Sequence, residues 1–144
     1  MLFRSRDAMS LARKHGKLAM GMYDAVKLIL GEQQDVKIVS AYVGPESLEE
    51  TITEALPGNP NEEVLVVTDV FGGSVNNAFL VKLNDYPKMH LMTGMNLGML
   101  LECFSRRDNE KLEETVQFIL KAGMEGCVYC NTLMTENTEN NFDF

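Results

Sequence analysis

The segment Val64–Val67 is an unbroken run of four aliphatic residues. A strand with one face in water alternates apolar and polar residues, so a short continuous run indicates a strand that is covered on both faces. Such strands occur where helices pack on both sides of a sheet, and this arrangement requires strands and helices to alternate along the chain. The run therefore predicts an α/β protein.

Segments of both kinds do alternate around this run. Strands are expected at 10–14, 36–43, 64–67, 89–93 and 126–129. Helices are expected at 18–30, from Pro45 to Leu56, and at 74–83, 97–104 and 112–121. We expect Gly31 to end the first helix, Pro57 to stop the second, and Asp108 to cap the last. The order predicts an α/β domain with a mostly parallel sheet.

The two ends of the chain fit this sheet less well. Charged residues interrupt every apolar group in 1–9, so neither face of a strand there could be buried without burying a charge. We therefore expect 1–9 to be an extension outside the sheet and Ser10–Lys14 to supply the first strand of a domain at 10–131. Residues Thr135–Phe144 are polar and are expected to be frayed, so that 132–144 forms a tail.

The charge of the chain excludes several function classes. The 144 residues have a formal net charge of −8, which argues against nucleic acid as the main partner and against an anionic membrane surface. No apolar run approaches the length of a membrane span, and the first residues carry too many charges for a secretory signal. We expect a cytoplasmic protein that meets a protein partner or a small anion.

Three cysteines, an odd and low number, indicate a reducing compartment. Cys127 and Cys130 form a C-x-x-C pair, but zinc needs four ligands and the chain has no second pair. The residues between them, Val128 and Tyr129, favour a strand, in which residues three apart face opposite sides. We expect structural cysteines, with a redox or metal role as the alternative.

In a parallel α/β sheet, ligands bind beyond the carboxyl ends of the strands. The segment Thr68–Ser74 follows one strand and contains Gly72 and Gly73, which allow a ligand to approach the backbone closely. Ser74 is expected to cap the next helix, whose first N–H groups favour negative charge. The segment predicts an anion-binding turn, and a plain glycine turn is the alternative.

His15 follows another predicted strand, between Lys14 and Gly16. Imidazole titrates near neutral pH and can attack phosphorus, but it needs a partner that fixes its tautomer. Asp69, at the end of a different strand, is suited to that role. An ordinary surface or helix-terminal histidine is the alternative. His90 lies in an apolar run and is expected to be a packed core histidine.

Four ordered motifs resemble a known family. They are His15–Ala19 (HGKLA), Thr68–Asn77 (TDVFGGSVNN), Gly94–Glu102 (GMNLGMLLE) and Glu125–Asn131 (EGCVYCN). Together they resemble the IIA component of the mannose-family (mannose, fructose, sorbose) phosphoenolpyruvate-dependent sugar phosphotransferase system. The resemblance covers about residues 11–131.

The resemblance implies a flavodoxin-like, doubly wound fold with a C-terminal antiparallel edge strand, often exchanged within a homodimer. It implies that His15 accepts a phosphoryl group from the phosphocarrier HPr and that a IIB component receives it. By motif, Asp69 orients the histidine, and Gly72, Gly73 and Ser74 bind the phosphate. No metal or organic cofactor is implied.

The first strand departs from the family pattern. The family has a compact apolar run that ends in a small residue, whereas Ser10–Lys14 holds only two apolar residues and ends in lysine. A regulatory phosphoacceptor and an inactive binding module of the same fold are therefore alternatives. A receiver-like domain with Asp69 as acceptor is disfavoured, because Arg13–His15 is basic where such a domain needs acidic Mg²⁺ ligands.

Overall fold

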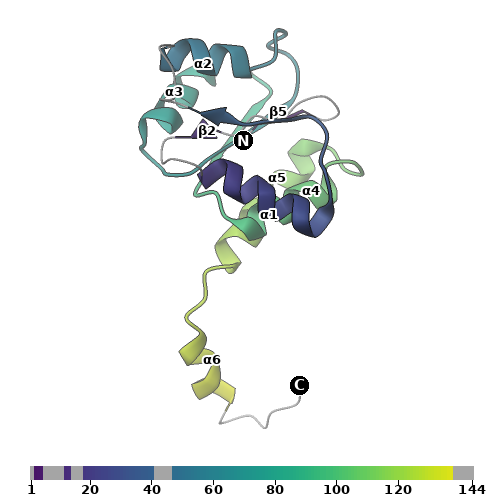
Figure 1. Cartoon of the computed structure of the whole chain (residues 1–144), viewed down its shortest axis with the longest axis vertical. Coiled ribbons are helices and arrows are strands. Elements are labelled where there is room, and N and C mark those ends of the chain that lie inside the picture. The colour runs from purple at the N-terminus through teal and green to yellow at the C-terminus, as the bar shows by residue number, and fades with distance from the viewer. Residues whose placement is uncertain (1, 5–11, 14–17, 41–46, 138–144) are drawn as a thin grey trace.

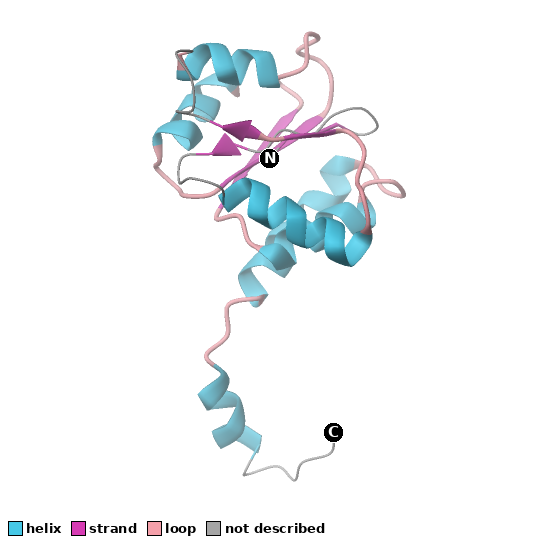
Figure 2. Ribbon diagram, viewed as in Figure 1, coloured by secondary structure: helices cyan, strands magenta, loops and turns pink. Residues whose placement is uncertain are grey.

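The computed structural model describes residues 2–4, 12–13, 18–40 and 47–137. Within these ranges the strands form a central layer, with helices α2 and α3 on one side and α1, α4 and α5 on the other (Figures 1 and 2). Helix α6 stands away from this body at the C-terminal end (Figure 1). The layered arrangement confirms the predicted α/β class.

The strands are β1 (Leu2–Arg4), β2 (Ala12–Arg13), β3 (Val36–Lys37), β4 (Val39–Ser40), β5 (Val64–Thr68) and β6 (Met89–Thr93). The helices are α1 (Leu18–Leu30), α2 (Leu48–Ala55), α3 (Ser74–Lys82), α4 (Leu97–Arg106), α5 (Leu112–Glu125) and α6 (Cys130–Asn137).

Strand β5 organises the main sheet, whose order is β3-β1-β5-β6. It pairs in parallel with β6, in register from Val64 opposite Met89 to Thr68 opposite Thr93. On its other side it pairs antiparallel with β1. Strands β2 and β4 form a separate parallel pair, and β2 also contacts β5.

The side chains of β5 divide between two apolar cores, one on each face of the sheet. Leu65 and Val67 belong to the core built with α1, α4 and α5. Val64 and Val66 belong to the core built with α2 and α3. All five residues of β5 are buried, so the interpretation of the aliphatic run as a strand covered on both faces is confirmed.

Local signals correctly predicted the C-terminal ends of α1 and α2. Helix α1 stops before Gly31, which has a φ of +80°, a conformation that glycine adopts without strain. Ser47 begins α2 in a capping box: its side chain accepts from Glu50 N, and the Glu50 carboxylate accepts from Ser47 N at 2.8 Å. These backbone and hydroxyl donors lower the pKa of Glu50. Helix α2 ends two residues before Pro57, as predicted, whereas the predicted start at Pro45 lies outside the described residues.

Two predicted helix caps are wrong. The N-cap of α3 is Gly73, whose extended backbone (φ −66°, ψ 158°) turns the chain, so Ser74 is already the first helical residue. The N-cap of α5 is Lys111 rather than Asp108, because the chain makes a further turn after α4 before α5 begins. Neither helix has a side-chain hydrogen bond at its N-cap.

The N-terminal prediction is also wrong. Residues Leu2–Arg4 were expected outside the sheet, yet β1 lies between β3 and β5 and pairs with both. A three-residue strand needs only backbone hydrogen bonds to its neighbours, so long-range pairing decided its place rather than an apolar pattern. The predicted strand at 36–43 is likewise divided between β3 and β4, which pair with different strands, and residues 41–43 lie outside the described ranges.

The strand predicted at 126–129 does not form in the part of the chain that the structure describes. Residues Gly126–Tyr129 are not a strand, and helix α6 follows from Cys130, reaching into the segment expected to be frayed. A strand needs a neighbouring edge to receive its hydrogen bonds. This segment leads away from the described sheet instead of running along it (Figure 1).

Asn96 joins the helices α4 and α5, and its removal should destabilise the domain. Its Oδ1 accepts from Met99 N at 3.0 Å as the N-cap of α4, and its Nδ2 donates to Gly123 O at 3.0 Å. Asn96→Ala loses a cap and leaves a carbonyl of α5 without this donor, so we expect a loss of about 2–3 kcal/mol in the free energy of unfolding. Urea denaturation would measure it. Asn109→Ala, at an exposed position, is the control, and equal effects of the two changes would contradict the assignment.

Candidate functional site

The segment that connects β5 to α3 forms a tight turn at the carboxyl edge of the parallel pair β5 and β6. Asp69 is half-buried, and its Oδ1 accepts from Val70 N at 2.8 Å. Gly73 N donates to Val70 O at 3.3 Å, and Gly72 has a φ of +74°. A Cβ added at Gly73 would lie 3.3 Å from Val70 O, so the tight turn favours glycine there, whereas the positive φ favours glycine at Gly72.

The turn presents the start of a helix to solvent. Helix α3 begins at Ser74, which is half-buried, and Asn77 N makes the first helical hydrogen bond to Gly73 O at 2.9 Å. The first N–H groups of a helix have no acceptor within the helix and favour an anion. The turn therefore has the local structure that an anion-binding site requires. Val70 and Phe71, which are 47% and 78% exposed, add an apolar surface beside it.

Two asparagines hold the turn in place. Asn77 is the last residue of the motif Thr68–Asn77, but neither asparagine was given a role from the sequence. The buried Thr68 hydroxyl donates to Asn76 Oδ1 at 3.0 Å, which ties the end of β5 to the first turn of α3. Asn77 Nδ2 donates to Gly72 O at 3.1 Å. The sequence signal that could have identified Asn76 is a polar residue at a core-facing position of a helix. Asn76 lies between the buried Val75 and Phe79, where an apolar residue would be expected.

The carboxyl edge holds buried polar atoms that lack a partner among the described residues. These are Asn76 Nδ2, on a residue that is 2% exposed, and Thr93 Oγ1, on the strand residue opposite Thr68. A buried polar group without a hydrogen bond costs free energy, so such groups need an explanation. Both atoms lie at the same edge of the sheet as the turn, so polar groups are gathered beside it.

The loop between β6 and α4 packs against the same edge. Met95 N donates to Thr68 O at 3.1 Å, and Gly94 has a φ of +83°. Residues of the motif Gly94–Glu102 therefore have structural roles. Gly94 makes the turn, Asn96 caps α4, and Met99 is buried.

His15 lies outside the described residues, and so does the rest of 14–17. Its neighbours in the chain are described: β2 ends at Arg13, and α1 begins at Leu18. Strand β2 contacts β5, and Ala19 at the start of α1 belongs to the same core as Val67 near the end of β5. The two elements that flank His15 therefore meet the strand that leads to Asp69.

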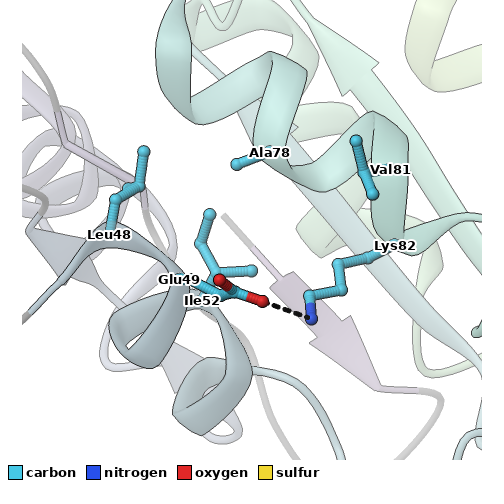
Figure 3. A pocket seen from close by; sticks show the side chains of 6 residues that line it. All are labelled: Leu48, Glu49, Ile52, Ala78, Val81 and Lys82. Atoms are coloured by element: carbon cyan, nitrogen blue, oxygen red, sulfur yellow. Dashed lines mark ion pairs between the residues drawn. The ribbon is translucent and has the colours of Figure 1, made fainter.

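Other candidates lie elsewhere. A hollow of about 320 Å³ separates α2 from α3, and Lys82 Nζ and Glu49 Oε1 are 3.8 Å apart across it (Figure 3). No residue of the turn lines it. His90, which was expected to be a packed core histidine, is half-buried on β6. Cys127 and Cys130 are exposed and free. Among the described residues, no cluster of His, Cys, Asp and Glu could hold a metal ion, and no helix is long and apolar enough to cross a membrane.

Comparison with known proteins assigns the family. Residues 13–120 match EIIA-man, described as the PTS system fructose IIA component. The chain belongs to the EIIA-man family. It is similar to the PTS system fructose-specific EIIA component of Bacillus subtilis, with 28% identity over 81% of this chain and 82% of that protein. It is also similar to the PTS system sorbose-specific EIIA component of Lacticaseibacillus casei, with 26% identity over 87% and 92%.

A solved structure from Klebsiella pneumoniae, named as a candidate phosphoenolpyruvate-dependent sugar phosphotransferase system permease, is 30% identical. It superimposes with a TM-score of 0.77 and covers 92% of this chain and 97% of its own. The resemblance inferred from the four motifs is thus confirmed for the EIIA-man family as a whole.

The Thr68–Asn76 pair provides a test of how the turn is held. Thr68→Val leaves Asn76 Oδ1 buried without this donor, so we expect a loss of about 1–3 kcal/mol in the free energy of unfolding. Asn76→Leu should cost a similar amount, and the double variant should lose clearly less than the sum because the two groups are one interaction. Urea denaturation of the three variants gives the coupling. Additive losses would contradict the bond.

Proposed function

We propose that this protein is a cytoplasmic phosphohistidine carrier of a sugar phosphotransferase system. His15 accepts a phosphoryl group from HPr and passes it to a IIB component during sugar uptake. The observation that carries the proposal is the turn Asp69–Ser74, which places a carboxylate, two glycines and a helix start at one edge of the sheet in a chain of the EIIA-man family. The finer fold assignment, flavodoxin-like and doubly wound, is part of this proposal.

In the proposed reaction, an imidazole nitrogen of His15 attacks phosphorus while the bond from phosphorus to the donor breaks. The transition state spreads negative charge over three equatorial oxygens. Preorganised N–H donors at Gly72 and the start of α3, with the Ser74 hydroxyl, stabilise that charge. Gly73, whose own N–H donates to Val70 O, lets the phosphate approach the backbone closely. Asp69 accepts from the second imidazole nitrogen, which fixes the tautomer and supports the charged ring. Transfer to IIB reverses the same steps, and the residues named need no metal or organic cofactor.

The partner proteins meet the chain beside this turn. Val70 and Phe71 are exposed apolar residues next to Asp69, and such residues are favoured at protein interfaces. We assign them to the surface that HPr and IIB contact in turn, since HPr must deliver its phosphoryl group to the same histidine from which IIB takes it.

A transfer assay in two stages tests the proposal. Radiolabelled phospho-HPr should label the purified protein, and addition of the cognate IIB component should remove the label. Loading without onward transfer to IIB would favour the regulatory phosphoacceptor. Failure of loading would favour the inactive binding module.

The protein is also proposed to be a homodimer. The C-terminal arm, defined as residues 126–137, projects from the body (Figure 1) and carries exposed apolar side chains at Val128, Tyr129, Leu133 and Met134. An isolated helix of eight residues is not stable in water, so α6 needs a surface to pack on. A second copy of the chain supplies that surface by a reciprocal contact.

Removal of the arm tests the dimer. Deletion from Gly126 onward should convert the dimer to monomer or aggregate, because it removes the apolar contact surface. Leu133→Glu should weaken the dimer at least tenfold, whereas Asn131→Glu, at an exposed polar position, should leave it intact. Light scattering over a concentration series measures both. A full-length protein that stays monomeric at high concentration contradicts the proposal.

A further inference from the structure

Two exposed cysteines are not used by the proposed phosphoryl transfer. Cys127 follows Gly126, the C-cap of α5, and Cys130 is the first residue of α6. Both thiols are free and exposed, and Cys130 Sγ lies 4.0 Å from Val128 O. In the single chain the two thiols are thus separated by two residues and open to a small reagent, so exchange occurs when the arm is free of the second copy.

A disulfide between the two cysteines would change the conformation of the linker between these helices. Residues 127–129 belong to neither a helix nor a strand and are drawn out between α5 and α6 (Figures 1 and 2). In extended backbone, Cα atoms three residues apart are separated by about 10 Å. A disulfide requires its Cα atoms to lie about 4.4–6.8 Å apart. A bridge between Cys127 and Cys130 therefore bends the linker into a turn and redirects α6.

We propose that Cys127 and Cys130 form a reversible dithiol–disulfide site that reacts with low-molecular-weight disulfides, and that closing it withdraws the arm from the second copy. One cysteine thiolate attacks a sulfur of the small disulfide, forming a mixed disulfide and releasing a small thiolate that takes up a proton. The other cysteine thiolate attacks the protein sulfur of the mixed disulfide. The S–S bond of the protein forms and a second small thiol leaves. The two cysteines lose two electrons and two protons, and the small disulfide gains them.

The third cysteine is the internal control. Cys103 is 1% exposed, and burial raises the pKa of its thiol well above the ordinary value. A thiol that is both shielded and protonated does not take part in disulfide exchange. Exchange should therefore be confined to the linker pair.

The effect on assembly rests on the proposed homodimer. The apolar side chains of the arm lie on and beyond the linker, so their positions depend on its path. When the linker is bent, these apolar side chains no longer lie where the extended linker places them for contact with the second copy. Reduction should favour the dimer, and oxidation should favour the monomer.

Mass mapping tests the bridge. The full-length protein is equilibrated in mixtures of oxidised and reduced glutathione, free thiols are alkylated, and the peptides are analysed. We expect a peptide lighter by two hydrogens that links Cys127 to Cys130, restored by reduced glutathione, with Cys103 alkylated only after unfolding. Cys127→Ser should carry glutathione on Cys130 and form no bridge. A wild-type protein that forms no bridge at any ratio, or bridges only between chains, overturns the proposal.

Light scattering on the same samples tests the consequence. Oxidised wild-type protein should dissociate at concentrations at least tenfold higher than reduced protein, and the variant with Cys127→Ser and Cys130→Ser should not respond to the glutathione ratio. A bridge that leaves assembly unchanged overturns the role of the arm. A reduced protein that is already monomeric overturns both the homodimer and that role, while mass mapping still decides the bridge. Loading from phospho-HPr is measured separately and decides the carrier function.

Discussion

Replacement of His15 by alanine is expected to abolish phosphorylation of the protein by phospho-HPr. The proposed reaction forms its new bond at the imidazole of His15, and alanine offers no nucleophile. The fold should persist, because neither β2 nor α1 includes this residue. Labelling with radioactive phosphate measures the first effect, and circular dichroism together with urea denaturation measures the second.

The second histidine of the chain is the matched control. His90 is half-buried on β6, and its neighbours in the strand pair with β5. His90→Gln should keep full labelling even if it lowers stability. Label that persists in His15→Ala and disappears in His90→Gln would show that His90, and not His15, is the acceptor.

Replacement of Asp69 by asparagine should slow phosphoryl transfer by about a hundredfold or more. The amide keeps the size of the side chain and an oxygen that can accept from Val70 N, so the turn should remain folded. It loses the negative charge that supports the imidazolium and fixes the tautomer. Single-turnover kinetics from phospho-HPr give the rate of transfer, and titration calorimetry gives the affinity for HPr, which should change much less.

Asp85→Asn is the control for the lost charge, since Asp85 is exposed beyond the end of α3. It should leave the transfer rate unchanged. Equal rates for wild-type protein and Asp69→Asn would remove Asp69 from the site. A loss confined to HPr affinity would assign Asp69 to docking rather than to transfer.

The sequence predicted those elements whose signals are local. The aliphatic run at Val64–Val67 specified a buried strand, and Gly31 and Pro57 marked helix ends through backbone geometry alone. The elements that it missed depend on distant partners. Strand β1 was discounted because of its charges, yet its place is set by pairing with β3 and β5. The last predicted strand failed for the converse reason, since apolar residues at Gly126–Tyr129 cannot form a strand without an adjacent edge.

The sequence predicted the turn of the candidate site, but not the hydrogen bonds that hold the turn in place. Asp69 and the two glycines predicted the turn, because an acidic residue and two glycines directly after a buried strand are typical of a turn. The bond from Thr68 to Asn76 could not be inferred, since each residue alone is compatible with a solvent-exposed position. Only packing shows that both are buried and that the hydroxyl and the amide face each other.

Localisation of the phosphate on the loaded protein shows directly whether His15 is the phosphoryl acceptor. The protein is loaded from phospho-HPr, digested at alkaline pH, and the modified residue is identified by tandem mass spectrometry with a parallel test of acid and alkali stability. We expect one phosphate on His15, lost in acid and stable in alkali. A phosphate on Asp69 or on Ser74, or a modification that alkali removes, would contradict it.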